Sequence, residues 1–338
     1  LSTVPENGFH IHQVGRSRHT RDTLTDWTER ACEIGQQAGC RIYHGYFVAY
    51  AGFIAAYAAR QMGAHSVVSA RGNDLDRLVF DPERATFTLW ALEHAAAITT
   101  VSTELQHKVW ALSGRQDAVW LPNGVDSARF RPVDDDVAVE LRATLGLSAA
   151  PVIGFVGEGR LKKGLALLLR AHAQIAPATG AQLLLVGGVR ASDQAVLDLY
   201  RAQHPELPVM VVPYKPQSEL PAYYQLMDVV LFPSLREGMP NALLEAMACA
   251  RPTISASVGG IVDVIRHGEN GWLVPPANEP VLVERLLAAL ADPVARALLG
   301  TAARRTVQQQ FTPERETAAN LGIYERLLPM DILPSFLL

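Results

Sequence analysis

The stretch LFPSLREGMPNALLEAMACARP, from Leu231 to Pro252, carries the features that decide the fold. It opens as the end of an apolar strand and passes at Pro233 into a short loop. Pro240 suits the first turn of a helix, where its missing N–H is no loss. Residues 241–250 are mostly good helix formers, and Arg251-Pro252 ends the run. A strand, a loop and a helix in this order predict one repeat of an α/β fold.

Two glutamates frame this helix, Glu237 in the loop before it and Glu245 inside it. A helix N-terminus offers unpaired backbone N–H groups and the positive end of the helix dipole, so it attracts phosphate. The two carboxylates could then contact neutral hydroxyls of the same ligand. The alternative is that both are solvated charges on a surface helix, and charge and spacing alone leave the two interpretations open.

Composition and charge narrow the class of protein. The 338 residues have the length of two domains, and 49% hydrophobic with 19% charged residues is typical of a soluble globular chain. A net charge of −4 argues against a nucleic-acid partner. Three cysteines without a CxxC pair fit a reducing compartment, and no apolar run reaches the roughly 18 residues of a membrane span. We therefore expect a cytoplasmic protein, and because the sequence opens at Leu1, one that lacks an N-terminal part.

Short apolar segments alternate with helical patterns along both halves of the chain. This alternation predicts parallel, doubly wound sheets. Helices are expected between the strands, among them one over 49–61 and one over 261–267. The expected strands lie at 8–15, 41–47, 66–70, 98–102 and 118–121 in the first half, and at 152–156, 182–186, 209–212, 229–232, 253–255 and 272–274 in the second.

A polar segment, residues 127–150, separates the two halves. Its acidic run, Asp134 to Asp136, is interpreted as a solvated face or a helix start, because consecutive carboxylates do not easily converge on one metal ion. We predict an N-terminal domain over 1–145, a C-terminal domain over 146–311 and a closing helix within 312–330, capped by Thr312.

The loop GEGRLKKG, from Gly157 to Gly164, follows an expected strand and precedes an expected helix, where a phosphate-binding loop belongs. Arg160 and Lys163 could neutralise a diphosphate there, the first as a planar fork and the second as a point charge. The alternative is a solvated basic turn. No GxGxxG motif follows any expected strand, which disfavours a nicotinamide dehydrogenase.

Four stretches in series resemble glycosyltransferase family 4, whose members have the two-domain GT-B fold. They are PNGVDSARF (Pro122–Phe130), GEGRLKKG (Gly157–Gly164), EGMPNALLE (Glu237–Glu245) and SVGGIVDVIRHGENGWLVPP (Ser257–Pro276). The resemblance implies an α/β protein of two Rossmann-like, doubly wound domains facing a cleft. It also implies retaining transfer of a sugar from a nucleotide-diphosphate donor to a hydroxyl acceptor, in polysaccharide or glycolipid synthesis.

The resemblance assigns roles to residues of the C-terminal domain. Arg160 and Lys163 would hold the donor diphosphate and stabilise the leaving group, and Glu237 would bind hydroxyls of the transferred sugar. Glu245 would bind the ribose. No metal or other cofactor is expected, because the two cations and the helix dipole offset the diphosphate charge, and no protein nucleophile is expected. The remaining donor-binding residues would be Gly157, Gly238, Met239, Pro240, Asn241, Gly259 and Gly260.

The N-terminal half departs from the family pattern. Arg71 stands where many members have a histidine that touches the donor sugar, and with His44 and Asp74 it is a candidate for the acceptor or donor side. The family's opening strand and glycine-rich loop are not found, so this domain is expected to be incomplete. The implied partners are a nucleotide sugar and a carbohydrate or lipid-linked acceptor, with peripheral contact to the inner face of a membrane. A non-catalytic nucleotide-sugar or partner-binding module and a GT-B nucleotide-sugar epimerase remain alternatives.

Overall fold

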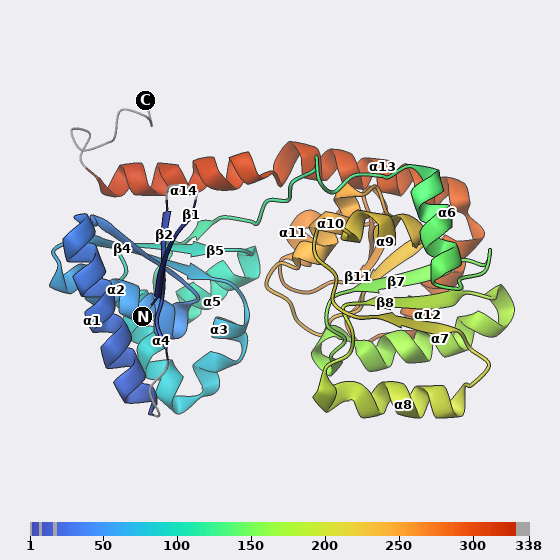
Figure 1. The fold of residues 1–338 in the computed structure, drawn as a ribbon, viewed down its shortest axis with the longest axis horizontal. Helices are drawn as coiled ribbons and strands as arrows, with labels where there is room; N and C mark the ends of the chain where they lie inside the picture. The colour runs from blue at the N-terminus through green and yellow to red at the C-terminus, as the bar shows by residue number, and fades with distance from the viewer. Residues whose placement is uncertain (1, 7–8, 16–18, 329–338) are drawn as a thin grey trace. The chain divides into compact units, whose positions relative to one another are not determined.

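The computed structural model describes residues 2–6, 9–15 and 19–328, and it divides into two compact units (Figure 1). Unit 1 contains the chain up to Leu121 and again from Ala319, and unit 2 is Pro122–Ala318. The structure divides between Leu121 and Pro122, earlier than the boundary between residues 145 and 146 that the sequence predicted. The reason is that the connecting segment packs on unit 2, where Phe130 and Leu147 are buried.

Unit 2 is built on a six-stranded parallel sheet in the order β12-β11-β10-β7-β8-β9. The chain first adds β8 and β9 on one side of β7, then crosses over and adds β10, β11 and β12 on the other. This reversal confirms the doubly wound fold for unit 2, and it creates a switch point between β7 and β10. The strands are β7 (Val152–Val156), β8 (Gln182–Val186), β9 (Val209–Val212), β10 (Val229–Phe232), β11 (Thr253–Ala256) and β12 (Trp272–Val274).

Helices cover both faces of this sheet (Figure 1). The strands are apolar on both faces because both are buried. On one face lie α7 (Leu165–Thr179), α8 (Gln194–Gln203) and α12 (Glu279–Ala291), whose leucines pack with Ile153, Leu183 and Leu231. On the other face lie α9 (Leu220–Leu226), α10 (Asn241–Ala248) and α13 (Pro293–Gln310).

Two short helices of unit 2 refine the expectations from sequence. The acidic run lies at the start of a helix, α6 (Asp135–Thr144). This agrees with the second of its two interpretations, a helix start. The helix expected over 261–267 is wrong in extent, because α11 (Ile261–Val264) has a single turn. Its continuation is prevented by the Asn270 side chain, which accepts the Arg266 N–H at 2.8 Å and so replaces the helical partner.

Unit 1 contains a four-stranded parallel sheet in the order β3-β4-β5-β6. Among the described residues each new strand is added on the same side of the previous one, so this sheet has no reversal of strand order like that of unit 2. Its strands are β3 (Ile42–Tyr46), β4 (His65–Ala70), β5 (Ala97–Thr100) and β6 (Val119–Trp120). The helices are α1 (Thr20–Ala38), α2 (Phe53–Gln61), α3 (Asn73–Asp76), α4 (Pro82–His94) and α5 (Thr103–Ser113). A π-helical turn, Val48–Gly52, forms the first part of the helix that was expected over 49–61.

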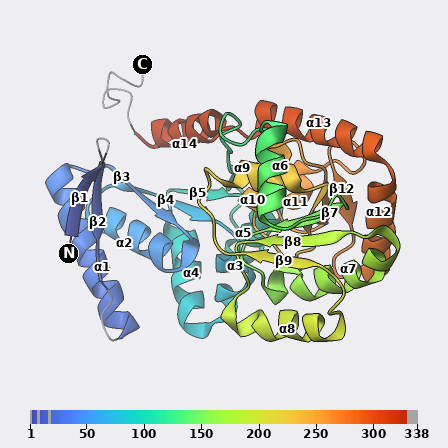
Figure 2. The ribbon, with the colours of Figure 1, turned by 45° about the vertical axis from the view of Figure 1, so that its right-hand side comes forward.

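The strand expected at 8–15 is present but belongs to a different sheet. As β2 (Phe9–Gln13) it pairs antiparallel with β1 (Ser2–Glu6), and the two form a sheet of their own (Figure 2). Two residues separate these strands in sequence. Such a short connection allows a hairpin, whereas a parallel pair needs a crossover of a dozen residues or more.

The last helix, α14 (Pro313–Leu327), begins in unit 2 and ends in unit 1. The Thr312 hydroxyl accepts the Arg315 N–H at 3.3 Å, as expected of an N-cap. Near its end, Ile323 packs on Val67 and Leu121 and covers the sheet of unit 1. Among the described residues no single helix is long and apolar enough to cross a membrane, and only a pair bent by 102°, 279–291 with 293–327, passes that test together. The apolar tail 332–338 lies outside the described residues.

Candidate functional site

The two candidate loops of unit 2 meet at the switch point of its sheet. The loop Gly157–Gly164 follows β7, and the loop from Pro233 to Pro240 follows the adjacent strand β10. They are joined by a backbone hydrogen bond from Leu235 N–H to the Lys162 carbonyl, 2.9 Å. Ligands of open α/β sheets bind beyond the carboxyl ends of the strands at such a point. The topology therefore brings the two sequence motifs together at the expected place.

Close packing between these loops requires glycine at one position. Gly164 has a φ of +78°, and a Cβ there would stand 2.1 Å from the Pro233 carbonyl oxygen. A side chain would separate the loops, so glycine lets the cationic loop rest directly on the acidic one.

Glu237 and Lys163 face each other across this junction. The Lys163 Nζ lies 3.6 Å from Glu237 Oε1, and the Ser234 hydroxyl donates to the same oxygen at 2.9 Å. The Glu237 side chain is 11% exposed, so it is not the solvated surface charge of the alternative interpretation. Ser234 was not singled out from the sequence. Its position two residues after the end of β10 and three residues before Glu237 is the only signal the sequence carried.

Arg160 has a carboxylate partner in its own loop. Its Nε and Nη2 both donate to Glu158 Oε2, and Arg190 Nε, from the loop after β8, lies 3.6 Å from the same oxygen. The two loops also contain Lys162 and Arg236, and the Asp193 carboxylate accepts the Leu161 N–H at 3.3 Å. Five cations thus accompany three carboxylates, those of Glu158, Asp193 and Glu237. The local charge is positive, which suits an anionic ligand.

Glu245 lies on α10 and is 6% exposed. Its Oε2 accepts a hydrogen bond from the Tyr224 hydroxyl of α9 at 2.9 Å. Burial raises the pKa of Glu245, and the Tyr224 hydrogen bond opposes that shift. Tyr224 lies on another helix, 21 residues before Glu245 in the sequence, so local sequence patterns could not identify it as the partner.

The start of α10 is fixed by the other candidate residues. Pro240 is the N-cap residue of α10. The sequence predicted it in the first helical turn, which begins one residue later. The Gly260 N–H donates to the Gly238 carbonyl at 2.6 Å, and Gly259 packs on the Glu237 carbonyl. Asn123, in the stretch Pro122–Phe130, donates to the Asn241 side chain at 2.7 Å and to the Met239 carbonyl at 3.4 Å. Asn123 was not predicted as a site residue, and it ties the connecting segment to this helix start.

Comparison with known proteins identifies the family of the domain that contains these loops. Residues 150–292 match the family Glycosyl transferases group 1. This part of the chain is a group 1 glycosyltransferase domain. The chain is 27% identical over 307 residues to N-acetyl-alpha-D-glucosaminyl L-malate synthase of Bacillus anthracis, covering 89% of this chain and 79% of the relative. It is 32% identical over 256 residues to D-inositol 3-phosphate glycosyltransferase of Rhodococcus opacus, covering 73% of this chain and 52% of that relative. The chain thus spans about half the length of this second relative.

Solved structures confirm the predicted fold. Sucrose-phosphate synthase from Thermosynechococcus elongatus superposes with a TM-score of 0.83, at 23% identity, over 96% of this chain and 85% of its own. Anabaena HepE in complex with UDP-glucose superposes with a TM-score of 0.75, at 21% identity, over 90% and 81% of the two chains. These structures confirm the prediction of the GT-B fold with Rossmann-like domains, and the family match over residues 150–292 confirms the prediction of a glycosyltransferase.

Two of the three candidates outside the group 1 domain, His44 and Asp74, hold parts of unit 1 together. Both ring nitrogens of His44 have partners, the Tyr324 hydroxyl at 2.6 Å and the Ser69 hydroxyl at 2.7 Å. Asp74 is fully buried, and its carboxylate accepts backbone N–H groups of Val48, Arg71 and Gly72. Burial lowers the pKa of His44 to about 4, with a smaller contribution from Arg71, so the imidazole is neutral at pH 7.

Arg71 lies with an aromatic side chain at the carboxyl end of the unit 1 sheet. Its guanidinium carbon stands 5.3 Å from the centre of the Tyr46 ring, and Tyr46 stacks on His44 at 4.5 Å. Phe47, which follows β3, has a φ of +75° and is half exposed. A backbone held in this unusual conformation beside a π-helical turn is a feature often found near functional sites.

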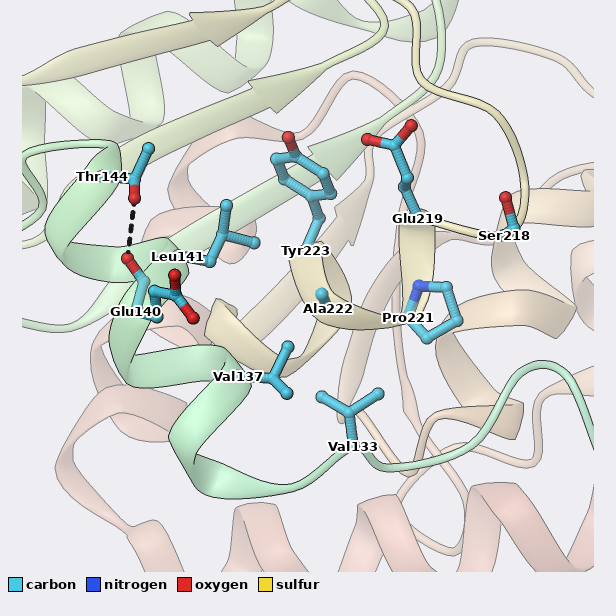
Figure 3. A pocket seen from close by; sticks show the side chains of 10 residues that line it. All are labelled: Val133, Val137, Glu140, Leu141, Thr144, Ser218, Glu219, Pro221, Ala222 and Tyr223. Carbon is cyan, nitrogen blue, oxygen red and sulfur yellow. Dashed lines mark hydrogen bonds between the residues drawn. The ribbon is translucent and has the colours of Figure 1, made fainter.

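Unit 2 also contains a pocket of about 390 Å³ between α6 and α9 (Figure 3). Val137 and Leu141 of α6 face Pro221 and Tyr223 of α9 across it, with Glu219 at the side. None of the candidate residues lines this pocket. No group of three or more His, Cys, Asp or Glu side chains placed to hold a metal ion occurs in the described part of the chain.

Proposed function

We propose that the chain is a retaining glycosyltransferase that moves a sugar from a nucleotide-diphosphate sugar, UDP- or GDP-linked, to a hydroxyl acceptor. The observation that carries this proposal is the junction of two loops at the switch point, where Lys163 faces Glu237. A cation for a leaving diphosphate and a carboxylate for sugar hydroxyls thus stand side by side.

In this proposal, Lys163 and Arg160 bind the diphosphate and stabilise the charge that develops on it as the sugar departs. Arg190, which shares the Glu158 carboxylate with Arg160, adds to the positive field. The helix α10 begins directly after the Pro233–Pro240 loop, and its N-terminus adds the positive end of a helix dipole. The carboxylates of Glu158 and Glu237 hold the two long cationic side chains in place before the ligand arrives.

Glu237 orients the transferred sugar. Its Oε1 is held by Ser234 and Lys163, which leaves Oε2 to accept a sugar hydroxyl. Because Glu237 is engaged in orienting the sugar, no protein nucleophile is assigned. The acceptor hydroxyl gives its proton to the departing phosphate as the new glycosidic bond forms on the same face.

The acceptor is proposed to meet the side chains at the carboxyl end of the unit 1 sheet, with Arg71 and Tyr46 as its contacts. Two relatives support a small hydroxylated acceptor by name, since one is N-acetyl-alpha-D-glucosaminyl L-malate synthase and the other is D-inositol 3-phosphate glycosyltransferase. A lipid-linked acceptor, peripheral membrane contact and a cytoplasmic location stay predictions from the sequence.

Calorimetric binding of UDP, GDP and ADP to the full chain tests the donor proposal. We expect one of them to bind clearly more tightly than the other two. Lys163→Ala should weaken that binding by about 1–3 kcal/mol, roughly 5- to 150-fold, since a charge-assisted contact to phosphate is lost.

Lys162→Ala is the matched control, because it removes the same charge one residue away. Its affinity should stay within about twofold of the wild type. Equal losses in the two variants would show that only the net charge matters. Absence of binding by all three nucleotides to the folded wild-type chain would overturn the proposal.

A further inference from the structure

A pocket of about 350 Å³ lies in unit 1, between the last turns of α5 and the segment that leads into β6. None of the candidate site residues lines it. The lining residues are Gln106, His107, Trp110, Arg115, Gln116 and Ala118. The pocket lies at the amino end of β6, because residues 114–118 enter that strand. Tyr46 and Arg71 lie at the carboxyl end of the same parallel sheet, so the pocket is separate from the proposed acceptor contacts.

Hydrogen bonds hold the walls of this pocket in place. Gly114, with a φ of +72°, ends α5, and its N–H donates to the Trp110 carbonyl at 2.8 Å, so the chain turns back next to Trp110. The Gln106 side chain donates to the Ala118 carbonyl at 2.8 Å and ties the helix to the returning segment. A ligand would therefore meet a preformed surface, which lowers the entropy cost of binding.

The charge in the pocket is already paired. Of the six lining residues, Arg115 alone carries a permanent charge, and its Nε donates to Asp117 Oδ1 at 2.9 Å. Its Nη1 donates to the Leu92 carbonyl at 3.1 Å. The Arg115 hydrogen bond lowers the pKa of Asp117, so both charges of this pair are present at neutral pH. The pocket therefore favours a neutral ligand over an ionic one.

An exposed indole forms one side of the pocket. Trp110 is 53% exposed, and the other exposed large hydrophobic side chain in residues 103–121 is Trp120. Val119 packs against the cluster around Ile323 of α14, so Trp120, the next residue of β6, points to the other face of the sheet, on which α5 lies (Figure 1). The surroundings of the two indoles are otherwise polar, whereas the core of a protein–protein interface is a continuous apolar patch.

Polar groups next to the indole are available to a ligand. Among the described residues, the exposed side chains of His107 and Gln116 form no hydrogen bond or ion pair. An amide offers donors and an acceptor together, and a neutral imidazole offers one of each. A sugar ring is the complementary shape, because its hydroxyls both donate and accept while its C–H groups pack on an aromatic face.

We propose that this pocket of α5 and residues 114–118 binds a neutral saccharide unit, which stacks on Trp110 and hydrogen-bonds to Gln116 and His107. The site lies away from the carboxyl ends of the strands, so it holds a saccharide chain without reacting with it. This goes beyond the proposed transfer reaction and does not depend on the nucleotide. The second indole, Trp120, offers a further platform on the same face for a chain of several sugars.

Calorimetry on the full chain with three neutral tetrasaccharides, namely maltotetraose, cellotetraose and tetra-N-acetylchitotetraose, tests this inference. We expect at least one of them to bind with a Kd on the order of 1 mM. Trp110→Ala should weaken that binding at least about tenfold, because the stacking surface is lost. Trp110→Phe keeps an aromatic face and should lose less. Gln116→Ala should cost about 2- to 10-fold, through one lost hydrogen bond.

Phe80→Ala is the matched control, since Phe80 is 80% exposed and does not line the pocket. It should bind the tetrasaccharide like the wild type, and the affinity for UDP, GDP or ADP should be the same in all these proteins. Wild-type affinity in Trp110→Ala would place the saccharide elsewhere on the chain and overturn the inference. Absence of binding by all three tetrasaccharides at about 20 mM would also overturn it, and a protein partner would then be the better occupant of the exposed indole.

Discussion

At Gly259 the loop after β11 touches the backbone of the Glu237 loop. A Cβ at this position would stand 1.8 Å from the Glu237 carbonyl oxygen, and the residue has a φ of +51°. Both the contact and the backbone conformation require glycine, and the loop it supports carries a proposed sugar-binding carboxylate.

Gly259→Ala should therefore destabilise unit 2 by about 2–4 kcal/mol, because conformational strain and overpacking add together. Gly268→Ala is the control, since its φ is +81° and no atom lies within 4 Å of the added Cβ. It should cost about 1 kcal/mol from the conformation alone. Urea unfolding of the three proteins measures this difference, and similar losses in both variants would show that the contact with Glu237 is unimportant.

Single residues show how far the sequence could predict the site. Glu237, Glu245, Arg160 and Lys163 were identified as candidates because each belongs to a motif next to an expected strand or helix end. Their partners could not be identified in this way. Tyr224 reaches Glu245 from another helix, and Asn123 reaches Asn241 from 118 residues away. Such contacts depend on tertiary packing, which leaves no local pattern in the sequence.

At the scale of elements, His44 connects several parts of unit 1. It joins β3 to α14 through Tyr324 and to β4 through Ser69, whose hydroxyl lies 2.5 Å from that of Thr99 on β5. Burial, aided by Arg71, lowers the pKa of His44 to about 4 from an ordinary value of 6.5. The folded state therefore favours the neutral imidazole.

The sign of the pH effect follows from this shift. Above pH 6.5 the imidazole is neutral in both the folded and the unfolded chain, so its full contribution to stability is present. As the pH falls from 6.5 towards 4, the unfolded chain takes up a proton that the folded chain does not. We expect unit 1 to lose about 1–3 kcal/mol over this range, a value reduced because the ring is only partly buried.

Amide hydrogen exchange of β3, β4 and β5 at pH 7.5 and pH 5 measures this loss in unit 1. His44→Gln, which keeps a polar side chain but does not titrate, should show a smaller change between the two pH values. An equal change in both proteins would mean that other groups control the acid sensitivity of this unit.

Whole elements were predicted where their local pattern was strong. The six strands of unit 2 were expected almost residue for residue, because fully buried parallel strands are short apolar runs bounded by polar loops. The antiparallel partner of β2 was missed, since Ser2–Glu6 carries little apolar character. The length of α11 was overestimated because the side chain of Asn270 takes over a backbone N–H group.

The whole molecule consists of two units with different sheets, and the proposed donor contacts all come from one of them. The motifs after β7 and β10, the start of α10 and Glu245 lie within Pro122–Ala318. The sequence predicted two domains but placed their boundary later. The segment with Asn123 and Phe130 is polar enough to be interpreted as a linker, yet its few apolar side chains are buried in unit 2.

This division predicts how a bound nucleotide affects stability. A ligand that binds only the folded state stabilises it by about 2.7 kcal/mol when present at 100 times its Kd. A nucleoside diphosphate without a sugar should touch only unit 2. Amide exchange in β7, β8 and β10 should therefore slow by roughly 100-fold under these conditions, while β3, β4 and β5 stay unchanged. The same nucleotide concentration applied to Lys163→Ala should give a smaller effect in unit 2, because less of that protein is bound. Equal protection in both units would show that the nucleotide also stabilises unit 1, and the proposed donor contacts would then be incomplete.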